Sequence, residues 1–398
     1  MIPKESAQPA VSNLSANAAQ SGQIALRRRG HVVQARPVTS AFIPGVELAR
    51  LYYAEVVGPL LRTELPRLRY TAALIGAGSE VLGFDSPRST DHDWGPRLQV
   101  FLADCDEEQG QAEYIRVLLA SRLPTMFRGW PTAFRASGAS TDQPASHWVT
   151  VAGLRSWLTR CLGFDPTAEV TLLNWLATPT QALAEVTGGG VFHDGLGGGG
   201  LGAMRATLAW YPHDVWLHVM ACQWQRISEE EPFPGRCAEA GDELGSSMVT
   251  ARLVRDLMRL ALLIQRRYPP YSKWLGSGLA QTAAAAELLP PMTAALRAST
   301  WAERESHLSA SCEAVARLHN TLAVTPPLDP AVRPTFYDRP YRVLDAGRFA
   351  HALRAQIRDE KVRALPMTGA VDQFVDSTTA IGDQALLRGA VTAQIRQA

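Results

Sequence analysis

The sequence lacks several features that would by themselves assign it to a class of protein. No uninterrupted apolar run approaches the roughly 18 residues that a membrane span requires. The first 40 residues contain no apolar segment of the kind that a secretory signal needs. The net charge is only +1 at pH 7, which argues against a broad electrostatic surface for nucleic acid or anionic lipid. We therefore expect a cytoplasmic protein whose partner is neither a membrane nor a nucleic acid.

Cysteine spacing and glycine spacing exclude two further kinds of site. The five cysteines are scattered without C-x-x-C spacing, so they are predicted to be reduced core thiols and not a disulfide frame or zinc site. Glycines gather in residues 188–202, but the G-x-x-x-x-G-K-[ST] pattern of a P-loop is missing. A flexible hairpin or lid tip, with VFHD as its strand, fits that segment better.

The features that are present indicate two domains. A chain of 398 residues, 46% hydrophobic and 19% charged, is long and apolar enough for more than one core. Residues 1–40 are predicted to be a disordered leader, with an organelle transit peptide as the alternative. Residues 41–205 mix strand and helix patterns, whereas residues 206–398 read as helices. The predicted fold class is therefore α+β, a small mixed-sheet domain followed by an all-helical bundle domain.

Helical periodicity places the main elements of both halves. In the front half, helices are predicted over residues 45–61, 107–123 and 154–162, and a short strand over residues 147–151. In the back half, helices are predicted over residues 214–227, 245–268, 280–289, 299–322 and 347–363. Proline or glycine stands at several of these boundaries, as is typical where helices end.

Residues 70–102 carry the strongest chemical signal. They read as an apolar strand, a turn at Gly78-Ser79, the triplet Asp91-His-Asp93 and a second apolar strand. Strand alternation predicts that Asp91 and Asp93 share one face. Two adjacent carboxylates repel each other unless a cation lies between them, and Mg²⁺ binds one or two carboxylates together with substrate phosphates. Because a Gly-Ser turn offers N–H groups to phosphates, a metal and phosphate site is predicted here.

This arrangement resembles the signature of the polymerase-β-like nucleotidyltransferase superfamily, in which a Gly-Ser turn precedes a strand with a paired Asp-x-Asp. The segments GSEVLGFDSPRSTDHDWGPR, LAWYPHDVW, GDELGSSMVTARLVRDLMRL and RRYPPYSKWLG are similar to an uncharacterised branch of it. Members of that branch join the nucleotidyltransferase domain to a helical domain, as kanamycin and other aminoglycoside nucleotidyltransferases do. The resemblance covers roughly residues 42–290. It implies an enzyme that moves an NMP from an NTP, such as ATP, to a small hydroxylated acceptor, with Mg²⁺ as cofactor.

The resemblance also assigns roles to individual residues. Gly78 and Ser79 would cradle the β- and γ-phosphates, while Asp91 and Asp93 would hold one or two Mg²⁺ ions. Lys273 would contact the triphosphate, because related helical domains carry a similar Lys-Trp pair. Packing of the neighbouring aromatic residues against the front domain is the alternative explanation for that segment.

Arginines could add further contacts to the triphosphate. Arg88 lies between the turn and the aspartates, and its guanidinium either binds a phosphate or pairs with Asp85 or another acid. Arg252, Arg255 and Arg259 repeat at helical spacing and form one basic stripe. That stripe either closes over the triphosphate or is a solvated helix face.

One part of the expected site is not identified. The superfamily usually places a third carboxylate on a neighbouring strand, but the strand over residues 147–151 carries Thr150 there. Asp194 could supply it from the VFHD strand, or the site binds one metal or none. The general base also stays open, and the acidic run from Glu229 to Glu231 is predicted to be a solvated turn.

Two other functions therefore stay open beside transfer. A degenerate nucleotidyltransferase fold would bind a nucleotide or partner without transferring anything. An enzyme acting on a substrate other than a nucleotide could also use the same cleft, since a fold does not fix a function. The acceptor and the oligomeric state are not readable from the sequence.

Overall fold

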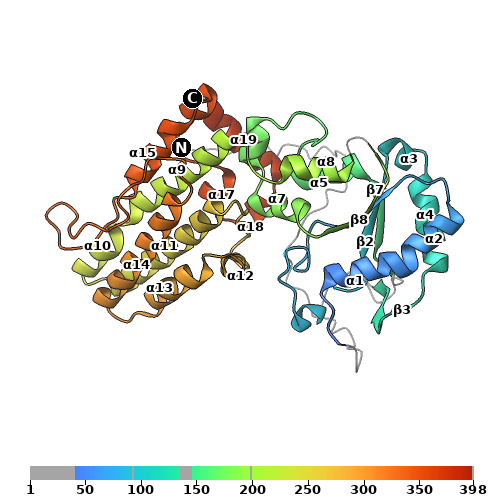
Figure 1. Ribbon diagram of the computed structural model, residues 1–398, viewed down its shortest axis with the longest axis horizontal. Helices are drawn as coiled ribbons and strands as arrows, with labels where there is room; N and C mark the ends of the chain where they lie inside the picture. The colour runs from blue at the N-terminus through green and yellow to red at the C-terminus, as the bar shows by residue number, and fades with distance from the viewer. Residues whose placement is uncertain (1–40, 92–93, 135–145, 198–199, 397–398) are drawn as a thin grey trace, which may run out of the picture.

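Helices form most of the described chain, and one small sheet lies toward one end of the molecule (Figure 1). The computed structural model describes residues 41–91, 94–134, 146–197 and 200–396. The predicted leader, residues 1–40, therefore lies outside the described residues. The chain combines a small mixed sheet with a helical C-terminal region, which agrees with the predicted α+β class at this level.

The sheet is built from four short strands. In spatial order they are β7 (Val149–Gly153), β2 (Leu98–Leu102), β1 (Thr71–Leu74) and β8 (Gly190–Asp194). β1 runs antiparallel to β2 and β8, whereas β2 runs parallel to β7. The carboxyl end of β1 therefore lies beside the amino ends of β2 and β7. We call this end of the strands the turn edge. All residues of β1 and β2 are buried.

Helices cover both faces of this sheet. The front helices are α1 (Gly45–Tyr52), α2 (Gly58–Glu64), α3 (Asp104–Glu108), α4 (Gln111–Arg122), α5 (Leu154–Leu162), α6 (Leu172–Ala177), α7 (Thr180–Thr187) and α8 (Leu201–Leu208). Val100 of β2 shares a core with Leu48 of α1 and Ile115 of α4. Phe101, which points the opposite way, shares a second core with Leu158 of α5. Because side chains alternate along β2, each face of the sheet packs against a different set of helices.

Short hairpins and irregular turns complete the front half. The two-residue strands are β3 (Met126–Phe127), β4 (Trp130–Pro131), β5 (Ala133–Phe134) and β6 (Ser146–His147). β3 pairs with β4, and β5 pairs with β6. The predicted strand over residues 147–151 is confirmed as β7, which begins and ends two residues later.

Two predicted helices are interrupted where the backbone chemistry requires it. The helix predicted over residues 45–61 contains a π-helical turn over Tyr53–Val57, shortly before Pro59. Proline has no N–H to donate, so the regular bonding pattern changes there. The helix predicted over residues 107–123 divides into α3 and α4 at Gly110, where φ is 80°. Glycine adopts that left-handed conformation at little cost.

The back half is a bundle of helices. They are α9 (His213–Glu230), α10 (Phe233–Glu239), α11 (Glu243–Ile264), α12 (Leu275–Ala280), α13 (Ala285–Arg297), α14 (Trp301–Asn320), α15 (Gly347–Gln356), α16 (Glu360–Ala364), α17 (Val371–Phe374), α18 (Thr378–Ile381) and α19 (Gln384–Ile395). Its core holds large side chains from four helices, namely Trp216, Trp224, Leu257, Val315 and Phe349. The predicted helix over residues 280–289 is wrong in extent, because Pro290 and Pro291 lie inside α13.

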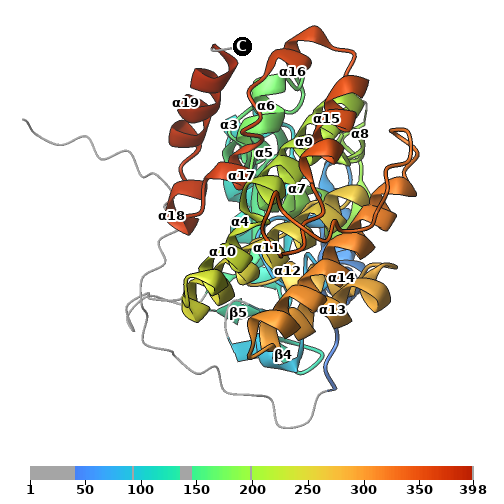
Figure 2. The ribbon, with the colours of Figure 1, turned by 90° about the vertical axis from the view of Figure 1, so that its left-hand side faces the viewer.

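The core runs continuously across the predicted domain boundary at residue 205. Phe101 of the sheet belongs to the same buried cluster as Trp216 of the bundle. The last helix also returns to the front half, where α19 packs against α6 (Figure 2). There Arg388 donates a hydrogen bond of 2.9 Å to the Asn174 side chain. Helices α5, α7 and α8 lie between the sheet and the bundle (Figure 1), so the boundary at residue 205 stays a prediction.

The last residue of the acidic run, Glu231, follows α9 directly and is held by backbone groups of a distant segment. Glu231 accepts backbone hydrogen bonds from Leu344, Asp345 and Ala346, at 2.8, 3.1 and 2.9 Å. Burial raises the pKa of its carboxyl to about 7, although these bonds oppose the shift. The prediction of a solvated turn is therefore wrong for Glu231, which anchors the start of α15.

Two sequence-level expectations concern membranes and thiols. In the ranges that the structure describes, every helix is too short or too polar to cross a bilayer. Cys222 and Cys312 are buried thiols, as predicted, whereas Cys105 is exposed and does not belong to the core.

Candidate functional site

The chain turns sharply where β1 ends, and residues 76–80 form what we call the Gly-Ser turn. The Gln99 side chain fixes the end of the strand by bonding both the N–H and the carbonyl of Ile75, at 3.1 and 3.0 Å. The next amide, of Gly76, donates to the Glu185 carbonyl at 2.8 Å. Gly76 has a φ of 85°, in the left-handed region that favours glycine. The turn is thus held between β2 and α7.

A buried ion pair braces the Gly-Ser turn. The Arg97 guanidinium donates to the Glu80 carboxylate at 2.6 Å and to the Ala77 carbonyl at 2.7 Å. The Glu80 side chain is only 3% exposed, so it needs this partner. A Cβ at Gly78 would clash with the Arg97 guanidinium, which explains why glycine stands there.

The Gly-Ser turn presents unused hydrogen-bond donors. Within the part of the chain that the structure describes, no acceptor is found for the backbone N–H groups of four successive residues, Ala77, Gly78, Ser79 and Glu80. The Ser79 hydroxyl likewise has no hydrogen-bond partner among the described residues. Successive N–H groups in a turn form a concave site for anions. The turn therefore has the chemistry that binds phosphate oxygens.

Asp91 does not lie on the strand as predicted. Asp91 ends a 3-10 turn over Pro87–Asp91, and β2 begins only at Leu98. The prediction of alternation along a strand is therefore wrong for Asp91, because its segment is not paired in the sheet. His92 and Asp93 lie outside the described residues.

The segment from Asp91 nevertheless reaches the turn edge. Asp91 is exposed, and the chain that follows it enters β2 at Leu98, directly after Arg97. Because Arg97 bonds to Ala77, the start of β2 and the Gly-Ser turn are neighbours. The chain that follows Asp91 therefore leads to the edge of the sheet at which the Gly-Ser turn lies.

Asp194 lies at the other edge. It pairs in register with Thr71, the first residue of β1, and accepts a hydrogen bond of 2.6 Å from the Thr71 hydroxyl. Its second oxygen accepts the Gly202 N–H at 3.1 Å, in the first turn of α8. The prediction that Asp194 completes the site is therefore wrong, because the length of β1 separates it from the Gly-Ser turn.

The position expected to carry the third acid is neutral. Thr150 is exposed on β7 and lies in register with Gln99 of β2. The resemblance in sequence predicts a carboxylate near this position, but the described strands supply no third acid at the turn edge.

The loop between the Gly-Ser turn and Asp91 is anchored by another acid. The Asp85 carboxylate accepts hydrogen bonds from the Gly45 N–H at 2.7 Å and the Trp94 indole at 3.1 Å. Asp85 therefore ties the loop to the start of α1. Arg88 is exposed on the 3-10 turn, so its predicted contact with a phosphate stays a prediction.

The basic stripe on α11 serves the bundle. Arg252 pairs with Glu230 at 2.5 Å, and Arg255 pairs with Asp376 at 2.8 Å. Arg259 donates to the Asp372 carbonyl at 2.9 Å. The prediction that Arg252 and Arg255 bind a triphosphate is corrected, because carboxylates of the back half occupy them and two of the three arginines hold the segment around α17.

Lys273 does lie beside the front half. Its ammonium is 4.7 Å from the ring centre of Trp274, and that ring stacks on Phe84 at 5.2 Å. The carbonyl of Gly83, which precedes Phe84, accepts a hydrogen bond of 3.0 Å from the Gln281 side chain. The predicted aromatic packing against the front half is thus confirmed for Trp274. Lys273 is exposed next to the loop that follows the Gly-Ser turn.

We expect the change Lys273→Gln to weaken the binding of an NTP about tenfold, since a hydrogen bond to a charged group contributes ~1.5–3 kcal/mol. Calorimetric titration with an α,β-methylene ATP analogue and Mg²⁺ measures the effect. Lys361→Gln, at an exposed lysine on α16, is the matched control and should bind normally. Equal dissociation constants for the two variants would contradict the role of Lys273.

Glu185 is a site residue that the sequence did not indicate. Its carbonyl holds Gly76 of the turn, and its carboxylate accepts a hydrogen bond of 2.7 Å from Gln181. Burial raises the pKa of this carboxyl, although Gln181 and the charge of Arg97 lower it. The same carboxylate helps to raise the pKa of Tyr271. A carboxyl with a raised pKa beside an anion-binding turn is a candidate general base.

The residues at the turn edge suit Mg²⁺ in the chemistry of their donors. Carboxylate oxygens are the hard ligands that this ion prefers, and one or two of them suffice when phosphates supply the rest. Asp91 is such a donor, and Asp93 is another by sequence. Among the described residues, no group of three or more His, Cys, Asp or Glu side chains is placed to share a metal. A site completed by substrate phosphates is the kind that fits.

Part of the chain is similar to a family that has no assigned activity. Residues 175–275 match the family described as Domain of unknown function (DUF4037). The matched segment runs from α6 to the start of α12, so it includes Glu185 and Lys273 but not the Gly-Ser turn. No curated protein and no solved structure matches the chain.

Proposed function

We propose that the chain is a metal-dependent nucleotidyltransferase, which moves an NMP from an NTP to a small hydroxylated acceptor. The observation that carries this proposal is the Gly-Ser turn, with four successive N–H groups for which the described residues offer no acceptor. Asp91 precedes the start of β2, which Arg97 joins to the turn, and Lys273 adjoins Trp274, which stacks on Phe84 in the loop after the turn. A triphosphate at the turn would therefore have a carboxylate and an ammonium group on neighbouring segments. The resemblance in sequence supports the same function.

In this mechanism the chain mainly binds and orients. The N–H groups of the Gly-Ser turn and the Ser79 hydroxyl would bind the β- and γ-phosphates, and Lys273 would add a positive charge. Asp91 and Asp93 would hold Mg²⁺, which supplies charge neutralisation at the phosphates when bound. The rigid link between Arg97 and the turn keeps these donors in place before the substrate arrives.

Glu185 would act as the general base. The acceptor hydroxyl oxygen forms a bond to the α-phosphorus, and the bond from that phosphorus to the bridging oxygen breaks. Pyrophosphate leaves with the electron pair, and the hydroxyl proton passes to the Glu185 carboxylate. Gln181 holds that carboxylate at 2.7 Å, and Arg97 lies close enough for its charge to act on it.

Glu185 predicts a specific dependence on pH. A base works only when deprotonated, so transfer should fall as the pH drops through the raised pKa of Glu185, above the usual glutamate range. The change Glu185→Gln should lower kcat about 100-fold and abolish this acid limb, because it keeps the bond to Gln181 but cannot take a proton. Initial rates from pH 4 to 9 measure both effects. Glu360→Gln, at an exposed residue of α16, is the control. An unaltered profile in Glu185→Gln would refute its role.

A binding protein without transferase activity is the second candidate. The neutral Thr150 on β7 favours it, since the described strands supply no carboxylate at the turn edge. Such a protein would bind an NTP through the Gly-Ser turn and leave it intact.

Nucleotide binding tests both candidates at once. A thermal unfolding series with ATP, GTP, CTP and UTP, each with and without Mg²⁺, should show Mg²⁺-dependent stabilisation by at least one of them. The change Ser79→Ala should reduce that shift. No stabilisation by any of the four would contradict both candidates.

A further inference from the structure

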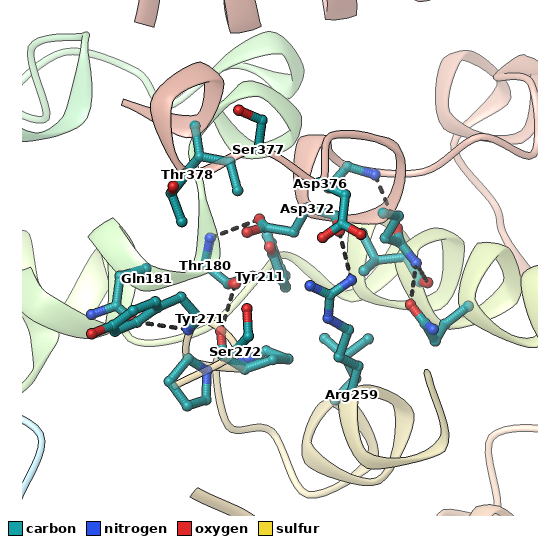
Figure 3. A pocket seen from close by; sticks show the side chains of 18 residues that line it. Thr180, Gln181, Tyr211, Arg259, Tyr271, Ser272, Asp372, Asp376, Ser377 and Thr378 are labelled. Atoms are coloured by element: carbon teal, nitrogen blue, oxygen red, sulfur yellow. Dashed lines mark hydrogen bonds between the residues drawn. The ribbon is translucent and has the colours of Figure 1, made fainter. Parts of the chain in front are cut away.

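A pocket opens between α7, α11 and the segment around α17 (Figure 3). We call it the α7–α17 pocket. Its volume is about 80 Å³, which is room for several water molecules at ~10–15 Å³ each. The polar side chains that the argument uses come from distant parts of the sequence, namely Thr180, Gln181, Tyr211, Arg259, Tyr271 and Asp372.

One buried polar group in this pocket has no partner. Tyr211 is only 4% exposed, and among the described residues its hydroxyl finds no hydrogen-bond partner. A buried hydroxyl without a partner costs free energy, so such groups usually serve a ligand or an ordered water. Tyr211 lines the pocket together with Thr180 and Asp372 (Figure 3). The fold therefore keeps a hydrogen-bonding group ready inside the pocket.

The charges that line the pocket are balanced. The carboxylate of Asp372 accepts the Thr180 N–H at 2.8 Å, while Arg259 donates to the Asp372 carbonyl at 2.9 Å. Asp376 is paired with Arg255 at 2.8 Å. Burial raises the pKa of Asp372 and lowers that of Arg259, so each charge is costly where it stands. A charged ligand would bring one more charge without a partner into this site.

The pocket also lies next to the candidate base. Gln181 lines it, donates to the Glu185 carboxylate at 2.7 Å and accepts the Tyr271 N–H at 3.1 Å. Tyr271 in turn precedes Lys273 by two residues. Gln181 therefore links the pocket to Glu185, and the carbonyl of Glu185 in turn holds Gly76 of the Gly-Ser turn.

We propose that the α7–α17 pocket binds the acceptor, and that this acceptor is a neutral ring compound with several hydroxyl groups, such as a cyclic polyol or monosaccharide. This inference rests on the proposed function, because only a transferase gives the bound ligand the role of acceptor. Hydroxyl groups both donate and accept, so a single ring can satisfy Tyr211, Asp372 and Arg259 together. Tyr271 and Pro270 also line the pocket, and their rings offer apolar surface for the apolar face of such a compound.

Ligand-observed NMR on the full chain tests the pocket without any need for turnover. The probes are myo-inositol, glucose and ribose as neutral compounds, with glucosamine and glucuronate as charged analogues. Each is titrated in the presence of Mg²⁺ and the α,β-methylene ATP analogue. The variants Tyr211→Phe and Asp372→Asn remove one pocket group each, and Tyr52→Phe changes a buried tyrosine of the other core as the matched control.

At least one neutral probe should bind, with a dissociation constant about tenfold higher in both pocket variants and unchanged in Tyr52→Phe. Preference for a charged analogue, equal binding by all variants or binding of none of the three neutral probes would overturn the proposal. Binding of the ATP analogue is recorded separately. A polyol that binds while no nucleotide does would refute the proposed function and support the pocket as a polyol site.

Discussion

The change Asp91→Asn should lower the rate of NMP transfer by about three orders of magnitude. Stabilisation of phosphate charge by a bound metal is worth several kcal/mol, and each ~1.4 kcal/mol is a factor of ten in rate. Asparagine is nearly the same size as aspartate but carries no charge, so it holds Mg²⁺ weakly. Single-turnover rates at saturating nucleotide and Mg²⁺ measure the loss directly.

Asp194→Asn is the matched control for this experiment. Asp194 is the other carboxylate that the sequence suggests, and the structure places it opposite Thr71 at the far edge of the sheet. We expect this variant to keep transfer within about threefold, since asparagine can still accept one of the two hydrogen bonds. Equal losses in Asp91→Asn and Asp194→Asn would contradict the assignment of the site to the turn edge.

The second large effect is on stability. The change Arg97→Met should lower the free energy of unfolding by about 3–5 kcal/mol, because it leaves the buried Glu80 carboxylate without its partner. The Ala77 carbonyl also loses its donor, so the Gly-Ser turn should loosen and nucleotide binding should fall with it. Urea denaturation followed by tryptophan fluorescence gives the free energy.

An exposed ion pair provides the comparison for Arg97. Arg122 bonds to Glu64 at 2.7 Å, with side chains that are 55% and 29% exposed. Arg122→Met should cost less than about 1 kcal/mol, since solvent screens such a pair. The double change Arg97→Met and Glu80→Leu should recover much of the stability but not the nucleotide binding. A small loss in Arg97→Met, similar to that in Arg122→Met, would show that the buried pair does not brace the turn.

Local patterns in the sequence predicted the order of strand, Gly-Ser turn and strand around the candidate site. The run from β1 through Gly78-Ser79 to β2 was readable because strands, glycines and acids come in one order. The positions of Asp91 and Asp194 could not be predicted. That of Asp91 depends on where β2 begins, and that of Asp194 depends on which end of β1 it pairs with. A shift of a few residues in a strand boundary moved Asp91 from a strand to a 3-10 turn.

Most contacts between distant segments could not be predicted, although the packing of Trp274 against the front half was. Arg252 and Arg255 look like a surface stripe in the sequence, but their partners lie elsewhere in the back half, and that of Arg255 is Asp376 beyond α17. Glu185 carried no motif, since its role depends on the carbonyl that holds Gly76 and on the side chain of Gln181. Lys273 was indicated by its neighbour Trp274, and only the fold shows that this ring stacks on Phe84.

Transfer itself can be measured most directly with an NTP labelled at the α-phosphate. The full chain is incubated with the labelled nucleotide, Mg²⁺ and a set of neutral polyols and sugars, beside Asp91→Asn and Glu185→Gln. We predict a new labelled product that forms in step with pyrophosphate and is lost in both variants. Label that stays in the NTP, or that appears only as free nucleotide at equal rates in all three proteins, would contradict nucleotidyl transfer at the Gly-Ser turn.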